Sequence, residues 1–294
     1  MDDDDPAIRV RGLRKAYKDN VAVAGVDLTV ARGEIFALLG PNGAGKTTTV
    51  EILEGYRKRD GGEVTVLGVD PAVVNGKRGT TTDATARHWR ERVGIVLQGT
   101  GEFDELTVGE VVRHFAQFYP APDDPAEVIT RVGLAEKTRA RTHTLSGGQK
   151  RRLDVALGII GRPELLFLDE PTTGFDPEAR REFWALIHDL QAGGTTIVLT
   201  THYLEEAEAL ADRVGVIAAG RLLAVDTPRR LGSRDSAQAT VSWQEPGGGW
   251  ERRPTATPTA LVAELAGRFG GEVPGLTVTR PTLEDVYLEM IGSA

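Results

Sequence analysis

Residues 40–47 read Gly40-Pro41-Asn42-Gly43-Ala44-Gly45-Lys46-Thr47 and match the phosphate-loop pattern G-x-x-x-x-G-K-[ST]. The apolar stretch Glu34–Leu39 precedes this loop and predicts a buried strand, and Thr47–Leu53 predicts a helix that stops at Gly55. A strand, a glycine-rich loop and a helix in this order form the context that the pattern requires. The stretch therefore predicts an α/β fold with a phosphate site; the alternative is a strand-to-helix turn that is glycine-rich by chance.

The residue types in this loop suit the chemistry of a triphosphate. Gly43 and Gly45 have no Cβ, so successive backbone N–H groups can point at phosphate oxygens, and the helix N-terminus adds partial positive charge. We expect Lys46 to reach the β- and γ-phosphates and the Thr47 hydroxyl to bind Mg²⁺. The predicted phosphate-binding residues are Gly40, Pro41, Asn42, Gly43, Ala44, Gly45, Lys46, Thr47 and Thr48.

The composition is that of an ordinary folded protein. The chain has 294 residues, of which 40% are hydrophobic and 27% charged, which predicts about two globular domains and excludes a disordered chain. Its 35 basic and 43 acidic side chains give a net charge of −8, so no nucleic-acid partner is expected. The absence of cysteine excludes disulfides and thiolate metal sites.

Two features of the sequence concern secretion and membrane insertion. The chain begins with Met1-Asp2-Asp3-Asp4-Asp5-Pro6, whereas a signal peptide needs a basic start and an apolar core. No stretch approaches the ~20 consecutive apolar residues of a spanning helix. We expect a cytoplasmic chain, and if it works at a membrane, another chain spans the bilayer.

Short apolar runs alternate with helical patterns along the chain, without an internal repeat. This rhythm is typical of an α/β protein with a largely parallel sheet. The residues Asp176-Pro177-Glu178 predict a helix start, with an N-cap, a proline in the first turn and an acidic side chain. The predicted strands are Val21–Val30, Glu34–Leu39, Val64–Leu67, Val93–Gln98, Leu165–Asp169 and Thr195–Thr201, and the predicted buried stripe of the helix is Phe183, Ile187 and Leu190.

The composition shifts at two places. The polar, Gly- and Thr-rich stretch Asn75–Thr82 predicts a mobile surface loop over residues 75–87. Beyond Leu231, an alternating stretch around Trp243, a short helical pattern, a strand at Val273–Thr279 and a final helix predict a small α+β unit. The expected division is an acidic tail at 1–7, a main domain at 8–230 with a helical subdomain at approximately 99–160, and a C-terminal domain at 231–294.

An apolar strand at Leu165–Leu168 ends in two carboxylates, Asp169 and Glu170. Strand ends in open α/β sheets lie at the ligand crevice. We therefore expect Asp169 to hold the metal and Glu170 to orient or deprotonate the attacking water. The alternative for such a pair alone is a strand that runs into a solvated turn.

The stretch Leu145-Ser146-Gly147-Gly148-Gln149 lies just upstream of this acidic strand. At this point the chain resembles the ATP-binding subunit of ABC transporters, in which this pentapeptide is the signature, and the resemblance extends from about Ile8 to Pro228. It implies a P-loop NTPase core with a mixed sheet, an ABC-type helical subdomain, and ATP hydrolysis with ATP and Mg²⁺. Ser146, Gly147, Gly148 and Gln149 are then expected at the γ-phosphate, and a serine-capped helix is the simpler, compatible interpretation.

The resemblance also assigns four single residues. Gln98 corresponds to the Q-loop glutamine, which contacts Mg²⁺ and the water, and His202 to the switch histidine, which contacts the γ-phosphate. Asp176 corresponds to the D-loop aspartate. Tyr17 lies where the family stacks an aromatic ring on adenine, with a buried strand aromatic as the alternative. Phe175 and the long 75–87 excursion depart from the family pattern and leave the dimer contact and the partner-facing surface less defined.

The family implies partners for the chain. Two such subunits, as a homodimer or heterodimer, meet head to tail, so that each ATP lies between the loop of one chain and the signature of the other. Membrane permease subunits are implied as partners, with the ATPase at the inner face of the membrane. The tail Pro281–Leu288 resembles that of ABC-2 type drug-resistance exporters and favours export. The alternatives are a soluble ABC-type ATPase of translation or DNA repair and a non-hydrolysing switch; a single phosphate loop argues against the former, and Glu170 with His202 against the latter.

Overall fold

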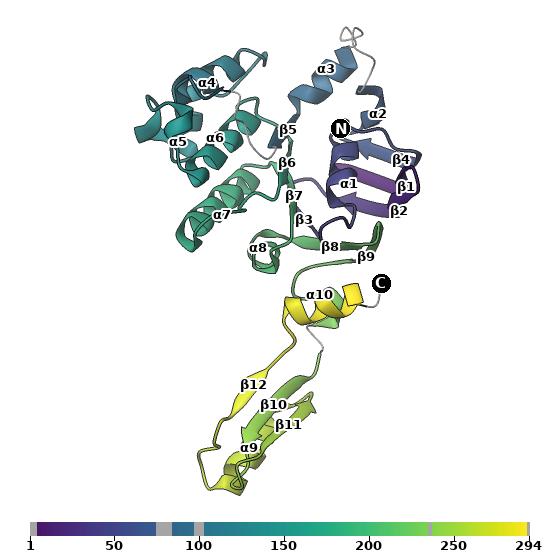
Figure 1. Cartoon of the computed structure of the whole chain (residues 1–294), viewed down its shortest axis with the longest axis vertical. Coiled ribbons are helices and arrows are strands. Elements are labelled where there is room, and N and C mark those ends of the chain that lie inside the picture. Colours follow the sequence, from purple (N-terminus) through teal and green to yellow (C-terminus); the bar gives the residue numbers. More distant parts are fainter. Residues whose placement is uncertain (1–4, 75–83, 97–102, 235–236, 293–294) are drawn as a thin grey trace. The chain divides into compact units, whose positions relative to one another are not determined.

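The computed structural model describes residues 5–74, 84–96, 103–234 and 237–292. The chain forms two compact units, Met1–Val225 and Asp226–Ala294 (Figure 1). Among the described residues, no helix has both the length and the apolar character needed to cross a bilayer.

A central sheet of six strands organises the first unit, in the order β5-β6-β7-β3-β8-β9. These strands are β3 (Ile35–Leu39), β5 (Val93–Val96), β6 (Leu165–Asp169), β7 (Thr196–Thr201), β8 (Arg213–Ala218) and β9 (Arg221–Asp226). From β5 to β8 all neighbours run parallel, as predicted. Every residue of β3 and β7 is buried, because a parallel sheet is covered on both faces and selects continuous apolar runs.

The helices next to this sheet carry the predicted start signals. They are α1 (Lys46–Leu53), α6 (Gly147–Ile159), α7 (Pro177–Ala192) and α8 (Leu204–Leu210). The Asp176 side chain accepts a hydrogen bond from the Ala179 N–H at 2.8 Å and caps α7, and Pro177 occupies the first turn. The predicted stripe of Phe183, Ile187 and Leu190 is buried, which confirms the helix and its core-facing side.

A second, antiparallel sheet of three strands has the order β2-β1-β4. It consists of β1 (Ile8–Tyr17), β2 (Asn20–Val30) and β4 (Gly61–Val66). The apolar runs of the sequence predict β2 and β4 but not β1. In β1 buried Ile8, Val10 and Leu13 are interspersed with basic side chains, so the strand has no continuous apolar run. It is a strand with one solvated face, which antiparallel sheets tolerate.

The segment between β4 and β5 differs from the predicted loop. Its residues 75–83 lie outside the described part of the chain, but residues 84–87 belong to the helix α3 (Ala84–Glu91), and α2 (Pro71–Val74) precedes them. Trp89 of α3 is buried and donates its indole N–H to the Val66 carbonyl at 2.9 Å. The loop prediction was therefore wrong for residues 84–87, because burial of Trp89 stabilises a helix whose sequence is otherwise polar.

The described residues between β5 and β6, from 103 onward, are mainly helical. They contain α4 (Val108–Ala116), α5 (Pro125–Arg131), the 3₁₀ turns η2 (Ala135–Lys137) and η3 (Thr142–Thr144), and α6. Thr107 and Glu110 form a capping box at α4, and Asp124 caps α5 with Pro125 in the first turn. These local signals define the helix starts without help from distant residues.

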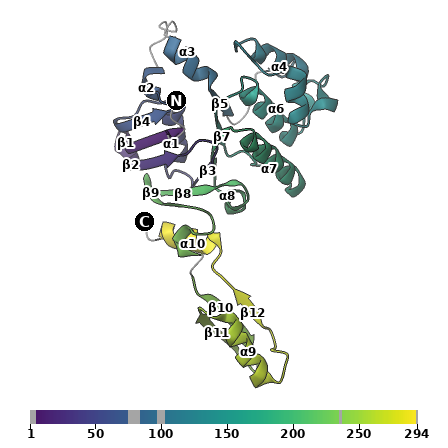
Figure 2. The same ribbon diagram turned by 180° about the vertical axis from the view of Figure 1, so that it is seen from behind.

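The second unit is a small α+β assembly with its own core. Its strands are β10 (Ala239–Gln244), β11 (Trp250–Thr255) and β12 (Thr277–Thr279), and its helices are α9 (Pro258–Phe269) and α10 (Leu283–Gly292), with the turn η4 (Leu231–Ser233). Figure 2 shows α9 alongside β10 and β11. Val241, Trp243, Leu261 and Leu265 form the core together with Val273. The predicted strand Val273–Thr279 is shorter than expected, because only its last three residues pair with β10.

Leu199 in β7 tests the central sheet. It is fully buried between its register neighbours Ala37 and Leu168, so Leu199→Ala should lower the free energy of unfolding by ~2–5 kcal/mol through lost burial and a cavity. Leu223→Ala removes the same atoms from β9, where the side chain is 37% exposed, and should cost far less. Urea denaturation followed by circular dichroism measures both; equal losses would contradict this core.

Candidate functional site

The predicted site residues lie at the carboxyl ends of three parallel strands, at one edge of the central sheet. β3 leads into the phosphate loop, β6 ends at Asp169, and β7 runs into His202. The register pairs Asp169 with Thr200 across β6 and β7, and Leu39 with Thr201 across β3 and β7. Residues that are far apart in the sequence therefore meet at the carboxyl ends of neighbouring strands, where ligands of open α/β sheets bind.

The phosphate loop joins β3 directly to α1. Gly45 precedes the helix with φ of 105°, and a Cβ at this position would lie 2.3 Å from the Ala22 carbonyl oxygen. Only glycine fits both the left-handed backbone and this close approach. The side chains of Asn42 and Thr47 are exposed, so the outer rim of the loop faces solvent.

Lys46, the first residue of α1, is buried although it is charged. Its Nζ donates hydrogen bonds to the carbonyl oxygens of Gly40 at 2.7 Å and Pro41 at 3.1 Å. Burial lowers the pKa of Lys46, and the nearby carboxylates of Glu170 and Asp169 act in the opposite direction. The ammonium group is thus held inside the loop, close enough to both carboxylates to interact with them electrostatically.

The end of β6 is hydrogen-bonded to β7 through Thr200, which the sequence did not indicate as a site residue. The Thr200 hydroxyl donates to the Asp169 carboxylate at 2.5 Å, and the Glu170 N–H donates to the Thr200 hydroxyl at 3.2 Å and to its carbonyl at 3.1 Å. A polar residue in a fully buried strand was the available signal, but its partner could only be identified from the register. Thr200 fixes the orientation of Asp169, the predicted metal ligand.

Glu170 and His202 lie next to each other at this edge. The Glu170 Oε1 lies 3.2 Å from the His202 Nδ1, and the two side chains are 19% and 37% exposed. Glu170 has φ of 43°, in the left-handed region that a non-glycine residue rarely adopts. The two predicted catalytic residues are therefore brought together, partly open to solvent, on a strained backbone.

The signature peptide forms the N-terminus of α6. Ser146 caps the helix by accepting from the Gln149 N–H at 3.3 Å, and the Gln149 side chain accepts from the Ser146 N–H at 3.1 Å. Ser146 and Gly147 are exposed. Figure 1 shows α6 and α1 on either side of the strands of the central sheet. The structure thus presents the start of the signature peptide, Ser146 and Gly147, on the surface.

The three remaining predicted site residues are Tyr17, Asp176 and Gln98. Tyr17 ends β1 with 36% of its surface exposed, and the Lys15 Nζ and the Arg57 guanidinium lie 5.3 and 5.2 Å from its ring centre. Asp176 is exposed and acts as the cap of α7. Gln98 lies outside the described residues.

Glu206 is a buried acid that the sequence did not single out. It is fully buried on α8, four residues after His202, and accepts a hydrogen bond from the Thr172 hydroxyl at 2.8 Å. Burial raises the pKa of Glu206, and the hydrogen bonds it accepts partly offset this effect. The contact connects the segment after β7 with the segment after β6. A glutamate among other acidic residues of α8 carries no sequence signal of this role.

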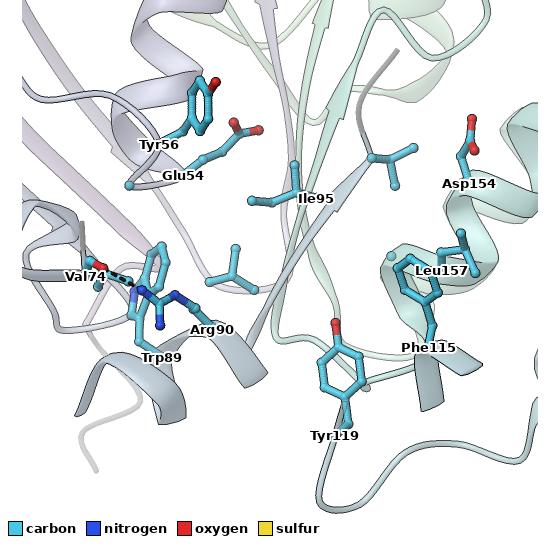
Figure 3. Close-up of a pocket in the computed structure, with 14 residues that line it drawn as sticks. Glu54, Tyr56, Val74, Trp89, Arg90, Ile95, Phe115, Tyr119, Asp154 and Leu157 are labelled. Carbon is cyan, nitrogen blue, oxygen red and sulfur yellow. Dashed lines mark hydrogen bonds between the residues drawn. The ribbon is translucent and has the colours of Figure 1, made fainter. Parts of the chain in front are cut away.

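A cavity of about 520 Å³ lies at the far end of α1 from the phosphate loop (Figure 3). Glu54, Tyr56, Trp89, Phe115 and Tyr119 are among its lining residues. Burial raises the pKa of Glu54 to about 7, with smaller contributions from the carboxylates of Asp169 and Glu51. The cavity is mainly apolar, and its lining includes Val96 at the carboxyl end of β5.

Gly45→Ala tests the phosphate loop. The new Cβ would collide with the Ala22 carbonyl and hold a left-handed backbone, so ATP affinity should fall tenfold or more, about 1.4 kcal/mol or above. Gly247→Ala is the control, because a Cβ there meets no atom within 4 Å. Isothermal titration with ATP measures both, and unchanged affinity of Gly45→Ala would contradict the close approach.

Glu54→Gln tests the buried carboxyl. The unfolded chain loses this proton near pH 4.5 and the folded chain near pH 7, so ionisation reduces stability as the pH rises through this range, by ~3 kcal/mol at pH 8. The variant should therefore be more stable than the parent at pH 8 and nearly equal to it at pH 4.5. Thermal unfolding at both values measures the gain, with Glu63→Gln, at an exposed position of β4, as the control. A gain that does not grow with pH would contradict the burial effect.

Comparison with known proteins agrees with this geometry. Residues 23–173 match the ABC transporter family. The chain is 40% identical over 294 residues to the fluoroquinolones export ATP-binding protein of Mycobacterium tuberculosis (strain CDC 1551 / Oshkosh), covering 97% of this chain and 93% of the relative. It is 36% identical over 316 residues to the daunorubicin resistance ATP-binding protein DrrA3 of Streptomyces coeruleorubidus, covering 98% and 96%.

A solved structure agrees as well. The protein cbiO1 from Clostridium perfringens, part of the ABC transporter complex cbiONQ, has a TM-score of 0.69 at 29% identity, over 78% of this chain and 91% of that chain. ABC ATPase subunits dimerise and work with membrane permease partners. The family that the signature peptide predicted is thereby confirmed. The chain belongs to the ABC transporter family and is an ATP-binding subunit that hydrolyses ATP.

Proposed function

We propose that this ATPase binds Mg-ATP between the phosphate loop of one chain and the signature peptide of a second, with Glu170 as the general base. The observation that supports it best is the 3.2 Å contact between Glu170 and His202 beside the hydrogen-bonded Asp169. A carboxylate can take a proton from water, and a histidine can hold that carboxylate and contact a phosphate oxygen.

The donor groups at the strand ends fit Mg²⁺. Asp169 offers a carboxylate oriented by Thr200, and the exposed Thr47 offers a hydroxyl from the start of α1. Mg²⁺ prefers such oxygen ligands and completes its shell with phosphate oxygens and water. When bound, the ion neutralises charge that develops on the phosphates. Asp169, Thr47 and Gln98 are the proposed ligands.

The remaining contacts with the nucleotide are assigned to the phosphate loop, to Lys46 and to Tyr17. The backbone N–H groups of Gly43–Gly45 and the N-terminus of α1 hold phosphate oxygens. Lys46 is already held in the middle of the loop by two carbonyl oxygens, and it would exchange these for β- and γ-phosphate oxygens. Tyr17 would stack on adenine in place of one of its two cationic neighbours. Because phosphoryl transfer depends mainly on positioning and charge, these contacts supply most of the catalysis.

A second copy or a sibling ATPase completes the site. Ser146 and Gly147 lie exposed at the N-terminus of α6, where unpaired N–H groups and the helix dipole suit an anionic phosphate. Asp176 at the start of α7 is also exposed and is proposed to take part in the dimer contact. A head-to-tail pair would bring each signature to the loop of the other chain.

The proposed partners are permease subunits of an exporter, with the ATPase at the inner face of the cell membrane. This rests on the names of the relatives, which include fluoroquinolone export and daunorubicin resistance, and on the net charge of −8, which disfavours nucleic acid. We assign ATP hydrolysis to the main domain, 8–230, and treat 231–294 as a separate C-terminal domain. The cargo would be chosen by the membrane subunits.

Glu170→Gln tests the proposed base. The amide keeps the shape but cannot take a proton, so turnover should fall by roughly 10²–10⁴-fold while ATP stays bound. Steady-state ATPase assays and ATP titration measure the two effects, and gel filtration with ATP should reveal a dimer. Exposed Glu63→Gln is the matched control. Turnover of Glu170→Gln equal to that of the parent would refute the role.

A further inference from the structure

The backbone of Glu170 needs support from its surroundings. Its φ of 43° is left-handed, and such a conformation costs a non-glycine residue of the order of 1–3 kcal/mol. Strain of this kind persists only where neighbouring contacts over-determine the backbone. The N–H of Glu170 is held by Thr200, and the carbonyl groups on either side of Glu170 are held from a different element.

That element is α6, through the guanidinium of Arg151. Its Nη2 donates to the Asp169 carbonyl at 2.6 Å and its Nε to the Pro171 carbonyl at 3.2 Å. The two accepting carbonyls belong to the residues immediately before and after Glu170. Arg151 is 8% exposed, so these hydrogen bonds are shielded from water. A single side chain thereby spans the strained residue.

Arginine suits this position for a chemical reason. The guanidinium is a flat fork whose N–H groups point in defined directions, whereas a lysine ammonium is a compact charge that cannot span two carbonyls in the same way. Burial lowers the pKa of Arg151, and the carboxylates of Asp154 and Asp169 counteract this. The Asp154 carboxylate lies 3.9 Å from Arg151 on the same helix and supports its charge.

We propose that Arg151 is a positioning residue for catalysis, which fixes the backbone conformation of Glu170 from the signature helix. This inference rests on the proposed role of Glu170 as the base. Ser146, which opens the same helix, lies five residues before Arg151. The contact therefore connects the helix that carries the signature with the backbone that carries the catalytic carboxylate.

The next residue is a matched control. Arg152 belongs to the same helix, and its guanidinium pairs with Glu182 at 2.5 Å and donates to the Val132 carbonyl at 3.3 Å. These contacts join α6 to α7 and to the end of α5 and do not involve the residues around Glu170. Arg152→Lys thus changes the same chemical group in the same helix without altering the support of Glu170.

The first experiment compares Arg151→Lys and Arg152→Lys in the full-length chain. Arg151→Lys should lower kcat on the order of 10²-fold with the KM for ATP nearly unchanged, because the phosphate loop is untouched and the carboxylate is misplaced. Arg152→Lys should change kcat by less than about threefold, because the partners of Arg152, Glu182 and the Val132 carbonyl, do not contact the residues around Glu170. Unchanged kcat in Arg151→Lys, or an equal loss in both variants, would overturn the proposal.

The second experiment repeats Arg151→Lys on Glu170→Gln. With the base already removed, the added change should leave the residual turnover within about twofold, since the two residues act as one unit. A merely structural role would reduce turnover by the same factor in both backgrounds and would overturn the inference. If Glu170→Gln alone keeps full turnover, the proposed base fails; if only Arg151→Lys keeps it, the positioning role alone fails.

The third experiment uses stability and does not depend on turnover. In a Glu170→Gly background the left-handed backbone is unstrained, so Arg151→Lys should lower the melting temperature clearly less than it does with Glu170 present. This comparison remains available if Arg151→Lys alone folds poorly. Equal decreases in the two backgrounds would show that Arg151 serves packing only and would overturn the proposal.

Discussion

Parallel pairing of the buried strands β3, β7 and β6 is the constraint on which the site depends. The phosphate loop, Asp169 with Glu170, and His202 follow these strands and come from segments about 130 and 30 residues apart along the chain. Parallel strands end at the same edge of a sheet, so the register of their backbone hydrogen bonds sets the separation of the groups that follow. The apolar residues that bury this sheet therefore hold the geometry of the chemistry as well as the fold.

The groups at this edge are held in conformations that cost free energy. Lys46 is a buried cation, Glu170 has a left-handed backbone, and Glu206 is a buried acid. Each is compensated locally: carbonyl oxygens receive the lysine, Thr200 holds the N–H of Glu170, and Thr172 donates to Glu206. Such strain is common where a site must be organised before its ligand binds. The Thr172–Glu206 hydrogen bond and the Glu170–His202 contact link the segments that follow β6 and β7.

The same chain carries two surfaces for one nucleotide. Its phosphate loop and its strand ends form one surface, and the exposed N-terminus of α6 forms the other. Helices α1 and α6, which begin at the phosphate loop and at the signature, lie on either side of the strands of the central sheet (Figure 1). Arg151 gives the second surface a direct contact with the first, through the carbonyls beside Glu170. Binding at the signature and positioning of the base would thus be physically related.

The sequence alone determined the phosphate loop, the central parallel strands, the helix caps at Ser146 and Asp176, and the family, because these depend on short motifs, apolar runs and local hydrogen bonds. It missed β1, whose apolar residues are separated by arginines, and it misjudged residues 84–87, where burial of Trp89 stabilises a polar helix. Thr200, Glu206 and Arg151 carry no motif, since their roles come from partners about 20 to 35 residues away. Only the tertiary structure decided these contacts, because the position of a buried polar group is set by the strand register and helix packing that bring its partner within hydrogen-bonding distance.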